Sequence, residues 1–294
     1  MIRLGLTGYP LGHSLSPRIH EAALRACGLD GNYSLFPISP DDKQGLEELL
    51  ARVRSGEITG LNVTIPHKQS VIRFLDELTP TAKAIGAVNT IYMRENRLIG
   101  ENTDAPGFLA DLKRSLTTET QRHKESNALV LGAGGSARAV VYALLEEGWK
   151  VTIAARRLDQ AKQLADSFTN YRAASRSDHL PPTICEPTNL QSLISSLSLI
   201  VNTTPVGMIP NIDQSPWPEN LPFPPRAAIY DLVYNPPETR LVREARAQGL
   251  PATTGLGMLI EQAALAFEIW TGHRPSREVL FTSATQSPRE ASNL

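Results

Sequence analysis

The chain has 294 residues, of which 41% are hydrophobic, and a formal net charge of −1. This length and composition predict one large or two ordinary globular domains. The balanced charge does not indicate a nucleic acid partner, and no apolar run reaches the ~18–20 residues that span a bilayer. Two cysteines, Cys27 and Cys185, provide neither a disulfide framework nor a zinc motif. We therefore expect a soluble, cytoplasmic protein without a bound metal.

Short strand-like runs alternate with amphipathic helical stretches, which predicts an α/β fold. Ser16 is expected to cap the first helix, with Pro17 at its first position. In the first part of the chain we expect strands at 2–7, 33–37 and 60–63, helices at 16–27, 41–54 and 104–115, and a hairpin of 88–93 with 97–100 around Glu95 and Asn96.

A polar stretch at 117–127 is expected to be a surface loop, after which the alternating pattern begins again. The proline-rich stretch at 205–225 predicts an irregular loop, because proline cannot donate a backbone hydrogen bond inside a helix. A frayed tail is expected from about residue 283. The remaining expected elements are strands at 128–131, 150–154, 199–202 and 228–231, and helices at 135–147, 158–168 and 258–270.

A glycine-rich turn between an expected strand and an expected helix indicates a dinucleotide site. Its sequence, Gly132, Ala133, Gly134, Gly135, Ser136 and Ala137, matches the G-x-G-x-x-G/A pattern. Gly132 permits a tight turn, Gly134 lets the backbone approach a pyrophosphate, and Ala137 leaves room for helix–strand packing. The helix N-terminus then offers N–H donors to the anion. The alternative is a plain glycine turn.

The end of the next strand bears on which nicotinamide cofactor is bound. NAD sites usually carry a carboxylate there, whereas this chain has Ala155, Arg156 and Arg157, with Asp159 just beyond. A guanidinium binds a 2′-phosphate in a fork, so these residues favour NADP(H) over NAD. One of the two arginines could instead be an ordinary surface residue.

Four further segments, at 8–17, 62–68, 86–90 and 101–104, are rich in polar side chains and follow or flank expected strands. In open α/β sheets, ligands gather beyond the carboxyl ends of strands. These segments therefore predict a substrate site. They read GYPLGHSLSP, NVTIPHK, GAVNT and ENTD.

These segments, taken with GAGG at 132–135 and GLGMLIEQA at 255–263, resemble the shikimate dehydrogenase family in content and order. The resemblance covers nearly the whole chain. It implies reversible reduction of 3-dehydroshikimate to shikimate with NADPH, in the shikimate pathway of aromatic amino-acid biosynthesis. It also implies two domains: a substrate domain of residues 1–104 plus 255–294, and a Rossmann-type, doubly wound NADP-binding domain of 105–254. The C-terminal helices would return to the first domain.

The resemblance also implies roles for individual residues. Lys68 and Asp104 would form the catalytic pair, and Ser14 and Ser16 would bind the substrate carboxylate. The other implied substrate contacts are Thr64, Asn89, Tyr234 and Gln262, and the implied cofactor contacts are residues 132–137 and 155–157 together with Gly255 and Met258.

The chemistry of hydride transfer supports Lys68 in this role. Negative charge develops on the ketone oxygen, and an ammonium group can stabilise that charge and deliver a proton. Asp104 would orient the lysine and oppose the desolvation that lowers a lysine pKa. His13 and His67 are interpreted as structural, because neither matches a catalytic position of the family.

Each of these residues could instead have a purely structural role. Ser14, Ser16 and Asp104 could only cap helices, and Lys68 could be a solvated lysine. The sequence is equally compatible with a backbone-pairing role for Asn89, a surface position for Gln262 and a partly core position for Met258.

The chain also departs from the family pattern. It has Ala155-Arg156-Arg157 where Asn-Arg-Thr is frequent, Glu101 where Asp is frequent, and Ala105-Pro106 where glycine is common. Rival hypotheses are an NAD-preferring quinate/shikimate dehydrogenase and a non-catalytic NADP- or metabolite-binding regulator. Either a monomer or a homodimer is compatible with the sequence.

Overall fold

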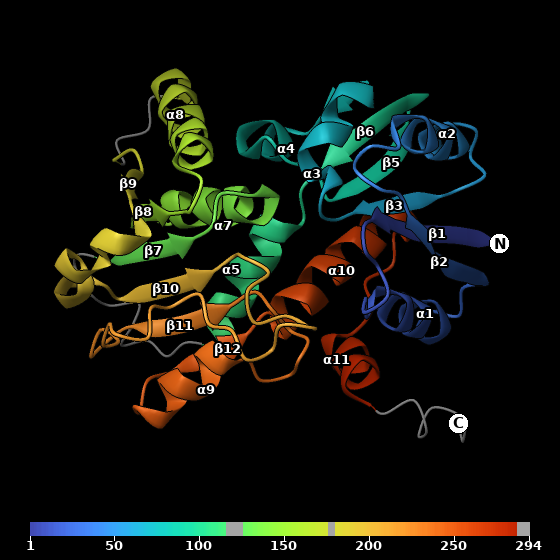
Figure 1. Ribbon diagram of the computed structural model, residues 1–294. Helices are drawn as coiled ribbons and strands as arrows, with labels where there is room; N and C mark the ends of the chain where they lie inside the picture. Colours follow the sequence, from blue (N-terminus) through green and yellow to red (C-terminus); the bar gives the residue numbers. More distant parts are fainter. Residues whose placement is uncertain (116–125, 176–179, 287–294) are drawn as a thin grey trace. The chain divides into compact units, whose positions relative to one another are not determined.

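The computed structural model describes residues 1–115, 126–175 and 180–286 (Figure 1). The chain divides into two compact units. Unit 1 consists of Met1–Thr103 and Leu259–Leu294, and unit 2 consists of Asp104–Met258. Each unit contains one six-stranded sheet, so the predicted α/β class with two sheets is confirmed. The surface loop predicted at 117–127 lies outside the described residues except for its last two positions. The tail predicted to fray from about residue 283 is helical as far as Thr285, so that prediction is wrong there, and residues 287–294 lie outside the described residues.

Unit 1 has a mixed sheet with the order β2-β1-β3-β5-β6-β4. Strands β1, β2 and β3 are parallel, whereas β5 is antiparallel to both β3 and β6. The strands are β1 (Ile2–Gly8), β2 (Gly31–Pro37), β3 (Gly60–Val63), β4 (Glu77–Leu78), β5 (Thr90–Arg94) and β6 (Arg97–Glu101). The predicted hairpin is confirmed: Glu95 and Asn96 both have positive φ, as a two-residue turn between β5 and β6 requires.

The helices of unit 1 pack on its sheet through periodic apolar faces. Leu46, Leu49, Leu50 and Val53 repeat at helical spacing on α2 and form one core cluster with strand residues such as Leu61. The helices are α1 (Ser16–Ala26), α2 (Lys43–Arg54), α3 (His67–Ser70), the 3₁₀ helix η1 (Val71–Phe74), α4 (Pro80–Ile85) and α11 (Arg277–Thr285), joined by most of α10 (Leu256–Thr271).

The C-terminal helices return to unit 1, as the sequence predicted. Helix α11 packs against α1, and the Trp270 indole on α10 donates a hydrogen bond to the Ile91 carbonyl at 3.1 Å. A Cβ at Gly60 would lie 2.4 Å from the Trp270 ring, so only glycine allows this approach of helix and strand.

Unit 2 has an all-parallel sheet with the order β12-β11-β10-β7-β8-β9. Numbered along the chain from β7, this is the 3-2-1-4-5-6 order of the Rossmann fold, and its direction reverses between β7 and β10. The strands are β7 (Asn127–Leu131), β8 (Lys150–Ala154), β9 (Thr183–Cys185), β10 (Leu199–Asn202), β11 (Ala228–Asp231) and β12 (Ala252–Thr254).

The helices of unit 2 are α5 (Asp104–Ser115), α7 (Gly135–Glu146), α8 (Leu158–Ser175) and α9 (Arg240–Ala247), with the 3₁₀ helices η2 (Pro187–Ser192) and η3 (Ile194–Ser196). As predicted, the proline-rich stretch between β10 and β11 contains neither helix nor strand. The elements that were not predicted are strands β4, β9 and β12, helices α3, α4, α9 and α11, and the 3₁₀ helices η1, η2 and η3. All are short, and short elements carry a weak periodic signal.

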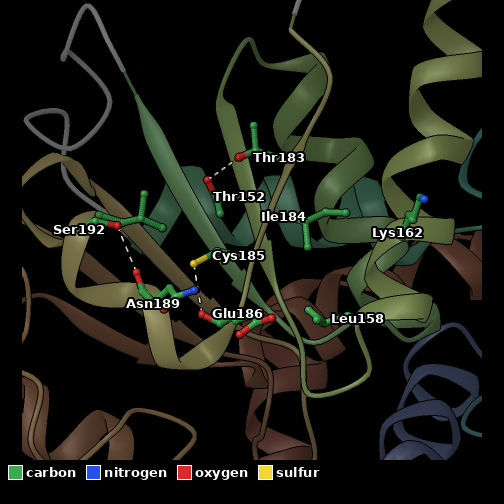
Figure 2. Close-up of a pocket in the computed structure, with 10 residues that line it drawn as sticks. Thr152, Leu158, Lys162, Thr183, Ile184, Cys185, Glu186, Asn189 and Ser192 are labelled. Carbon is green, nitrogen blue, oxygen red and sulfur yellow. Dashed lines mark hydrogen bonds between the residues drawn. The ribbon is translucent and has the colours of Figure 1, made fainter.

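The outer edge of the unit 2 sheet borders an open cavity of about 520 Å³ (Figure 2). Leu158 and Lys162 line it from α8, and Cys185 and Glu186 line it from β9 and the residue after it. The Thr152 and Thr183 hydroxyls, 2.9 Å apart, link β8 to the edge strand. None of the site residues predicted from the sequence lines this cavity.

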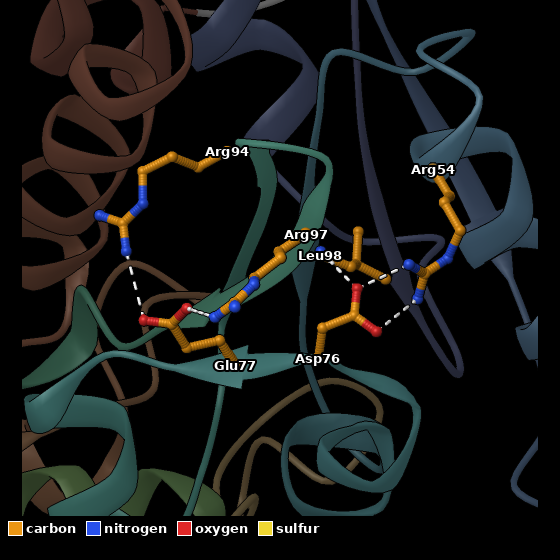
Figure 3. Close-up of polar contacts among 6 residues, drawn as sticks. All are labelled: Arg54, Asp76, Glu77, Arg94, Arg97 and Leu98. Atoms are coloured by element: carbon orange, nitrogen blue, oxygen red, sulfur yellow. Dashed lines mark hydrogen bonds and ion pairs between the residues drawn. The ribbon is translucent and has the colours of Figure 1, made fainter.

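The corresponding short edge strand of unit 1, β4, is held by ion pairs (Figure 3). Asp76 pairs with Arg54 at 2.6 Å and accepts the Leu98 backbone N–H at 2.7 Å. These contacts hold the pKa of Asp76 below its ordinary value. Glu77 pairs with Arg94 and Arg97 across the hairpin. Because these pairs are exposed, they fix the register of β4 more than they stabilise the fold.

His20 is an unusual core residue of unit 1. Its ring is 1% exposed and stacks on Tyr33 with a centroid separation of 4.4 Å and an interplanar angle of 2°. Phe267 and Trp270 lie at centroid distances of 6.2 and 5.5 Å. Among the described residues, neither imidazole nitrogen has a hydrogen-bond partner. Burial lowers the pKa of His20 to about 3.

This buried imidazole predicts a loss of stability in acid. The unfolded chain takes up a proton at His20 below its ordinary pKa of 6.5, whereas the folded protein does so only near pH 3. The stability present above pH 6.5 is therefore lost as the pH falls from 6.5 towards 3, by about 2 kcal/mol at pH 5. We expect the melting temperature of the wild type to fall by a few degrees more than that of His20→Phe between pH 7.5 and 5.

Replacing the exposed His273 by phenylalanine is the matched control, because it removes an imidazole from the surface. All other groups titrate in both proteins, so their contributions cancel in the comparison. A wild type and a His20→Phe variant that lose the same number of degrees would contradict the prediction.

Candidate functional site

Backbone hydrogen bonds in unit 1 join two of the segments that the sequence singled out, 62–68 and 86–90, to each other and to the end of β1. The Thr64 N–H donates to the Thr7 carbonyl at 2.9 Å, which joins the ends of β3 and β1. The Val63 N–H donates to the Asn89 carbonyl at 2.8 Å. The Val88 N–H donates to the Lys68 carbonyl at 2.7 Å. Thr64, Lys68 and Asn89 therefore lie on adjoining backbone at one end of the sheet.

The Asn89 side chain is the centre of this cluster and is 2% exposed. Its Oδ1 accepts the Thr103 N–H at 2.7 Å and the Thr90 hydroxyl at 3.1 Å. Its Nδ2 donates to Thr103 Oγ1 at 2.9 Å and to Gln262 Oε1 at 3.2 Å. Asn89 therefore pairs with buried backbone and also contacts a second predicted site residue. Gln262 is buried rather than surface-facing.

The capping role expected for Ser16 is wrong. Helix α1 has Leu15 as its N-cap, and no side chain caps it. Leu15 already has helical dihedral angles, so Ser16 begins the helix instead of preceding it. The Ser14 hydroxyl accepts the Ser16 N–H at 3.2 Å, which brings the two serines together in one turn. Ser14 is half-buried and Ser16 is buried.

Lys68 lies on α3, directly after the end of β3, and is half-buried. The neighbouring His67 is 2% exposed, and its Nε2 lies 2.7 Å from the Ile38 carbonyl, which is a structural contact. His13 is exposed. Asp104 is the first residue of α5 and is 4% exposed; it follows Thr103, whose backbone N–H Asn89 holds.

The structure adds residues that the sequence reasoning passed over. Thr103, Thr90 and Asn62 all bond to Asn89 or its backbone. Each lies within one of the recognised segments, beside a residue that was named. Only their buried polar character could have singled them out, because a hydroxyl or amide inside an apolar core requires a partner.

In unit 2, the glycine turn has the predicted strand–turn–helix context. Gly132 has φ +115°, and a Cβ there would lie 2.5 Å from Thr203 Oγ1. Gly134 is the N-cap of α7, and a Cβ there would meet no heavy atom within 4 Å among the described residues. Ala137 is fully buried against the sheet. The turn therefore presents an open backbone surface at the N-terminus of a twelve-residue helix, next to the reversal of strand order.

The three residues that follow β8 differ in their exposure to solvent. Ala155 is buried, whereas Arg156 and Arg157 are exposed between the strand and α8. The register pairs Ala154 with Cys185 on β9. Two guanidinium groups are thus accessible at the carboxyl end of the second strand of the Rossmann order.

The segment after β11, which contains Tyr234, is fixed by a buried carboxylate. Asp231 Oδ1 accepts the Asn202 side-chain amide at 2.8 Å and the Val233 N–H at 3.0 Å, and its Oδ2 accepts the Thr239 hydroxyl at 2.6 Å. Burial raises the pKa of Asp231 to about 6, and these hydrogen bonds oppose the shift. Tyr234 itself is half-buried.

Gly255 and Met258 lie close together in the sequence at the start of α10. A Cβ at Gly255 would lie 2.2 Å from the Leu232 carbonyl oxygen, so a side chain does not fit there. Met258 is 6% exposed, which agrees with a partly core position.

Three family models match the chain. They describe a shikimate dehydrogenase substrate binding domain at residues 6–91, a shikimate / quinate 5-dehydrogenase at 114–213 and a shikimate 5'-dehydrogenase C-terminal domain at 255–280.

Whole-chain relatives agree with these matches. A shikimate dehydrogenase (NADP(+)) from Symbiobacterium thermophilum is 41% identical over 282 residues, which cover 96% of this chain and 92% of the relative. The corresponding protein from Salinibacter ruber is 43% identical over 90% of both chains. The chain belongs to the shikimate dehydrogenase family.

Solved structures of the family have the same fold. Shikimate 5-dehydrogenase from Thermus thermophilus, in complex with NADP(H) and shikimate, is 39% identical with a TM-score of 0.81, covering 97% of this chain and 98% of the other. Quinate dehydrogenase from Corynebacterium glutamicum, in complex with NAD, is 31% identical with a TM-score of 0.84, covering 96% and 98%. In the described part of the chain, no helix is long and apolar enough to cross a membrane.

Replacing each of the two glycines of the turn by alanine should affect stability to different extents. Gly132→Ala forces a side chain into a positive-φ conformation against Thr203, and should lower the free energy of unfolding by about 1–3 kcal/mol. Gly134→Ala places its methyl group in open space and should change it little. Denaturant unfolding of the two variants measures both values, and equal losses would contradict the prediction.

Proposed function

We propose that this chain catalyses the reversible NADPH-dependent reduction of 3-dehydroshikimate to shikimate. The observation that carries the proposal is whole-chain identity of 41–43% to relatives named NADP(+)-dependent shikimate dehydrogenases. The clustering of Thr64, Lys68 and Asn89 at one end of the unit 1 sheet supports it, as does the Rossmann order of unit 2. On this proposal, unit 1 with the C-terminal helices is the substrate domain and unit 2 is the NADP-binding domain.

In the proposed site, most of the side chains that hold the substrate belong to unit 1. Ser14 and Ser16 share one turn and would bind the carboxylate. Thr64, Asn89 and Gln262 would bind the ring hydroxyls, with Tyr234 as a further contact. Both Asn89 amide protons are directed, one to Thr103 and one to Gln262. A ring hydroxyl of the substrate that binds here would therefore replace Gln262 Oε1 as the acceptor of the second Asn89 amide proton.

Lys68 and Asp104 would carry the chemistry on the protein side. Reduction places negative charge on the ketone oxygen, and the Lys68 ammonium group would stabilise this charge and give the oxygen a proton. Asp104 would orient the ammonium group and favour its charged form. In the reverse direction, the same lysine would accept the proton of the substrate hydroxyl.

The residues of unit 2 fit a dinucleotide phosphate. The open space at Gly134 leaves room for a pyrophosphate against the N–H groups of the first turn of α7. Residues 132–137 would hold this group, the segment 155–157 would hold the adenosine end, and Gly255 and Met258 would lie near the nicotinamide. When bound, NADPH supplies the hydride.

Replacing Lys68 by alanine should lower kcat by ~10²–10⁴, which is the usual scale for loss of a general acid–base group. The KM for shikimate should change less, because the substrate keeps its other proposed contacts. The measurement is the initial rate of NADPH formation from shikimate.

Lys83→Ala is the matched control, since it removes an exposed lysine from the neighbouring helix α4. Its kcat should equal that of the wild type. A Lys68→Ala enzyme with near-wild-type kcat would remove Lys68 from the mechanism.

The exposed arginines predict a preference for NADP over NAD. If one of them binds the 2′-phosphate, its replacement by alanine should lower kcat/KM for NADP roughly ten- to hundredfold. The same variant should leave kcat/KM for NAD nearly unchanged, because NAD lacks that phosphate. Arg156→Ala and Arg157→Ala are therefore assayed with each cofactor.

Arg226→Ala, an exposed arginine elsewhere in unit 2, is the control. Equal kcat/KM values for NADP and NAD in the wild type would contradict the assignment.

Assays with quinate test the rival activity that the resemblance to quinate dehydrogenase raises. No turnover of either substrate with either cofactor would instead favour a non-catalytic binding protein. A cytoplasmic location and a monomeric or homodimeric state remain predictions.

A further inference from the structure

The hydroxyl of Tyr33 begins a buried series of hydrogen bonds in unit 1. Tyr33 lies on β2, is 5% exposed, and donates to Asn62 Oδ1 at 2.8 Å. This contact directs the Asn62 amide nitrogen to the other side. Asn62 Nδ2 donates to the Asn89 carbonyl at 3.1 Å and to Thr90 Oγ1 at 3.3 Å.

The series continues into the proposed substrate site. The Thr90 hydroxyl donates to Asn89 Oδ1 at 3.1 Å, and Asn89 Nδ2 donates to Gln262 Oε1 at 3.2 Å. The Thr103 N–H also donates to Asn89 Oδ1 at 2.7 Å, so Thr103 fixes which way the Asn89 amide faces. Asn62 adds a second support, because it holds the Asn89 backbone carbonyl and the Thr90 hydroxyl and so the position of the segment that carries Asn89.

The Tyr33 ring is held in place from outside this series. His20 stacks flat on it at 4.4 Å, and His20 in turn packs against Phe267 and Trp270 of α10. With no hydrogen-bond partner for either imidazole nitrogen among the described residues, His20 contributes ring contact rather than a bond. Tyr33 thus has a fixed ring and a directed hydroxyl, although none of the sequence motifs includes it.

We propose that Tyr33 is a positioning residue for the ring hydroxyls of the substrate, acting through Asn62 on Asn89 and Gln262. The proposal rests on the proposed function. Tyr33→Phe preserves the ring and its stacking but leaves Asn62 Oδ1 without that donor. The Asn62 side chain, still bonded to the Asn89 carbonyl, then has a buried oxygen without that donor and shifts, which displaces the Asn89 backbone that it supports. Asn89 carries this displacement to its contact with Gln262.

The test measures kcat and the KM values for shikimate and NADP in Tyr33→Phe. We expect the KM for shikimate to rise roughly two- to thirtyfold, the range seen when a residue acts on a site through others. The KM for NADP should stay within twofold of the wild type, because all the residues in the series belong to unit 1. An unchanged KM for shikimate in folded Tyr33→Phe would overturn the proposal.

Tyr230→Phe is the matched control. Tyr230 is fully buried in unit 2, and its hydroxyl donates to Asp111 Oδ2 at 2.7 Å. The variant loses one buried tyrosine hydroxyl bond, as Tyr33→Phe does, and should lower the melting temperature without changing the KM for shikimate. An equal rise of this KM in both variants would mean that any loss of stability produces it, which overturns the proposal.

A double-mutant cycle tests the route through Asn62. In an Asn62→Ala background, Tyr33→Phe should have little further effect on the KM for shikimate, because the residue that transmits its effect is gone. Thr90→Val replaces Asn62→Ala if the latter does not fold. If the double variant shows a rise in the KM for shikimate equal to the product of the rises in the two single variants, the route through Asn62 is overturned. Turnover of shikimate by the wild type, measured in the same assay, separates failure of the proposed function from failure of the positioning role.

Discussion

The Asn89 amide is the interaction on which the proposed substrate site depends. One side chain joins the residue before β5 to the backbone of Thr103, just before Asp104, and to Gln262 on α10. These positions are 14 and 173 residues away in the chain. Because the amide is buried, an unmade bond would cost about 1–3 kcal/mol, so the segments are held together more firmly than loop contacts would hold them.

Unit 2 uses a buried carboxylate in a similar way. Asp231, at the end of β11, bonds to Asn202 at the end of β10 and to Thr239 at the start of α9. In unit 2 the side chain stands at the end of a parallel strand, whereas in unit 1 Asn89 stands just before β5, which is antiparallel to both of its neighbours. In both cases the side chain lies beside strand ends, where the connecting segments carry no regular backbone pairing of their own. Buried side-chain bonds supply the missing pairing.

Burial of these groups has a cost that the fold offsets elsewhere. Asp231 has a raised pKa because burial disfavours its charge, and three hydrogen bonds reduce that penalty. His20 has no such bonds among the described residues and stays neutral instead. The neutral His20 ring gains apolar contacts instead, by stacking on Tyr33 and packing against Trp270 of α10. The core of unit 1 therefore contains a titratable imidazole, that of His20, which contributes by holding the neighbouring Tyr33 ring in place.

The sequence by itself determined the α/β class, most strand positions, the glycine turn and the recognised segments. Strand periodicity, the conformational needs of glycine and the order of motifs are local properties, so they can be read without coordinates. The cap of α1 and the short elements were wrong or missed because a single residue, or a few, gives too little local signal. Only the tertiary structure decided that Asn89 meets Gln262 and Thr103, and that Tyr33 connects to them through Asn62. Those contacts depend on strand order and helix return, which bring distant residues together and which no local pattern encodes.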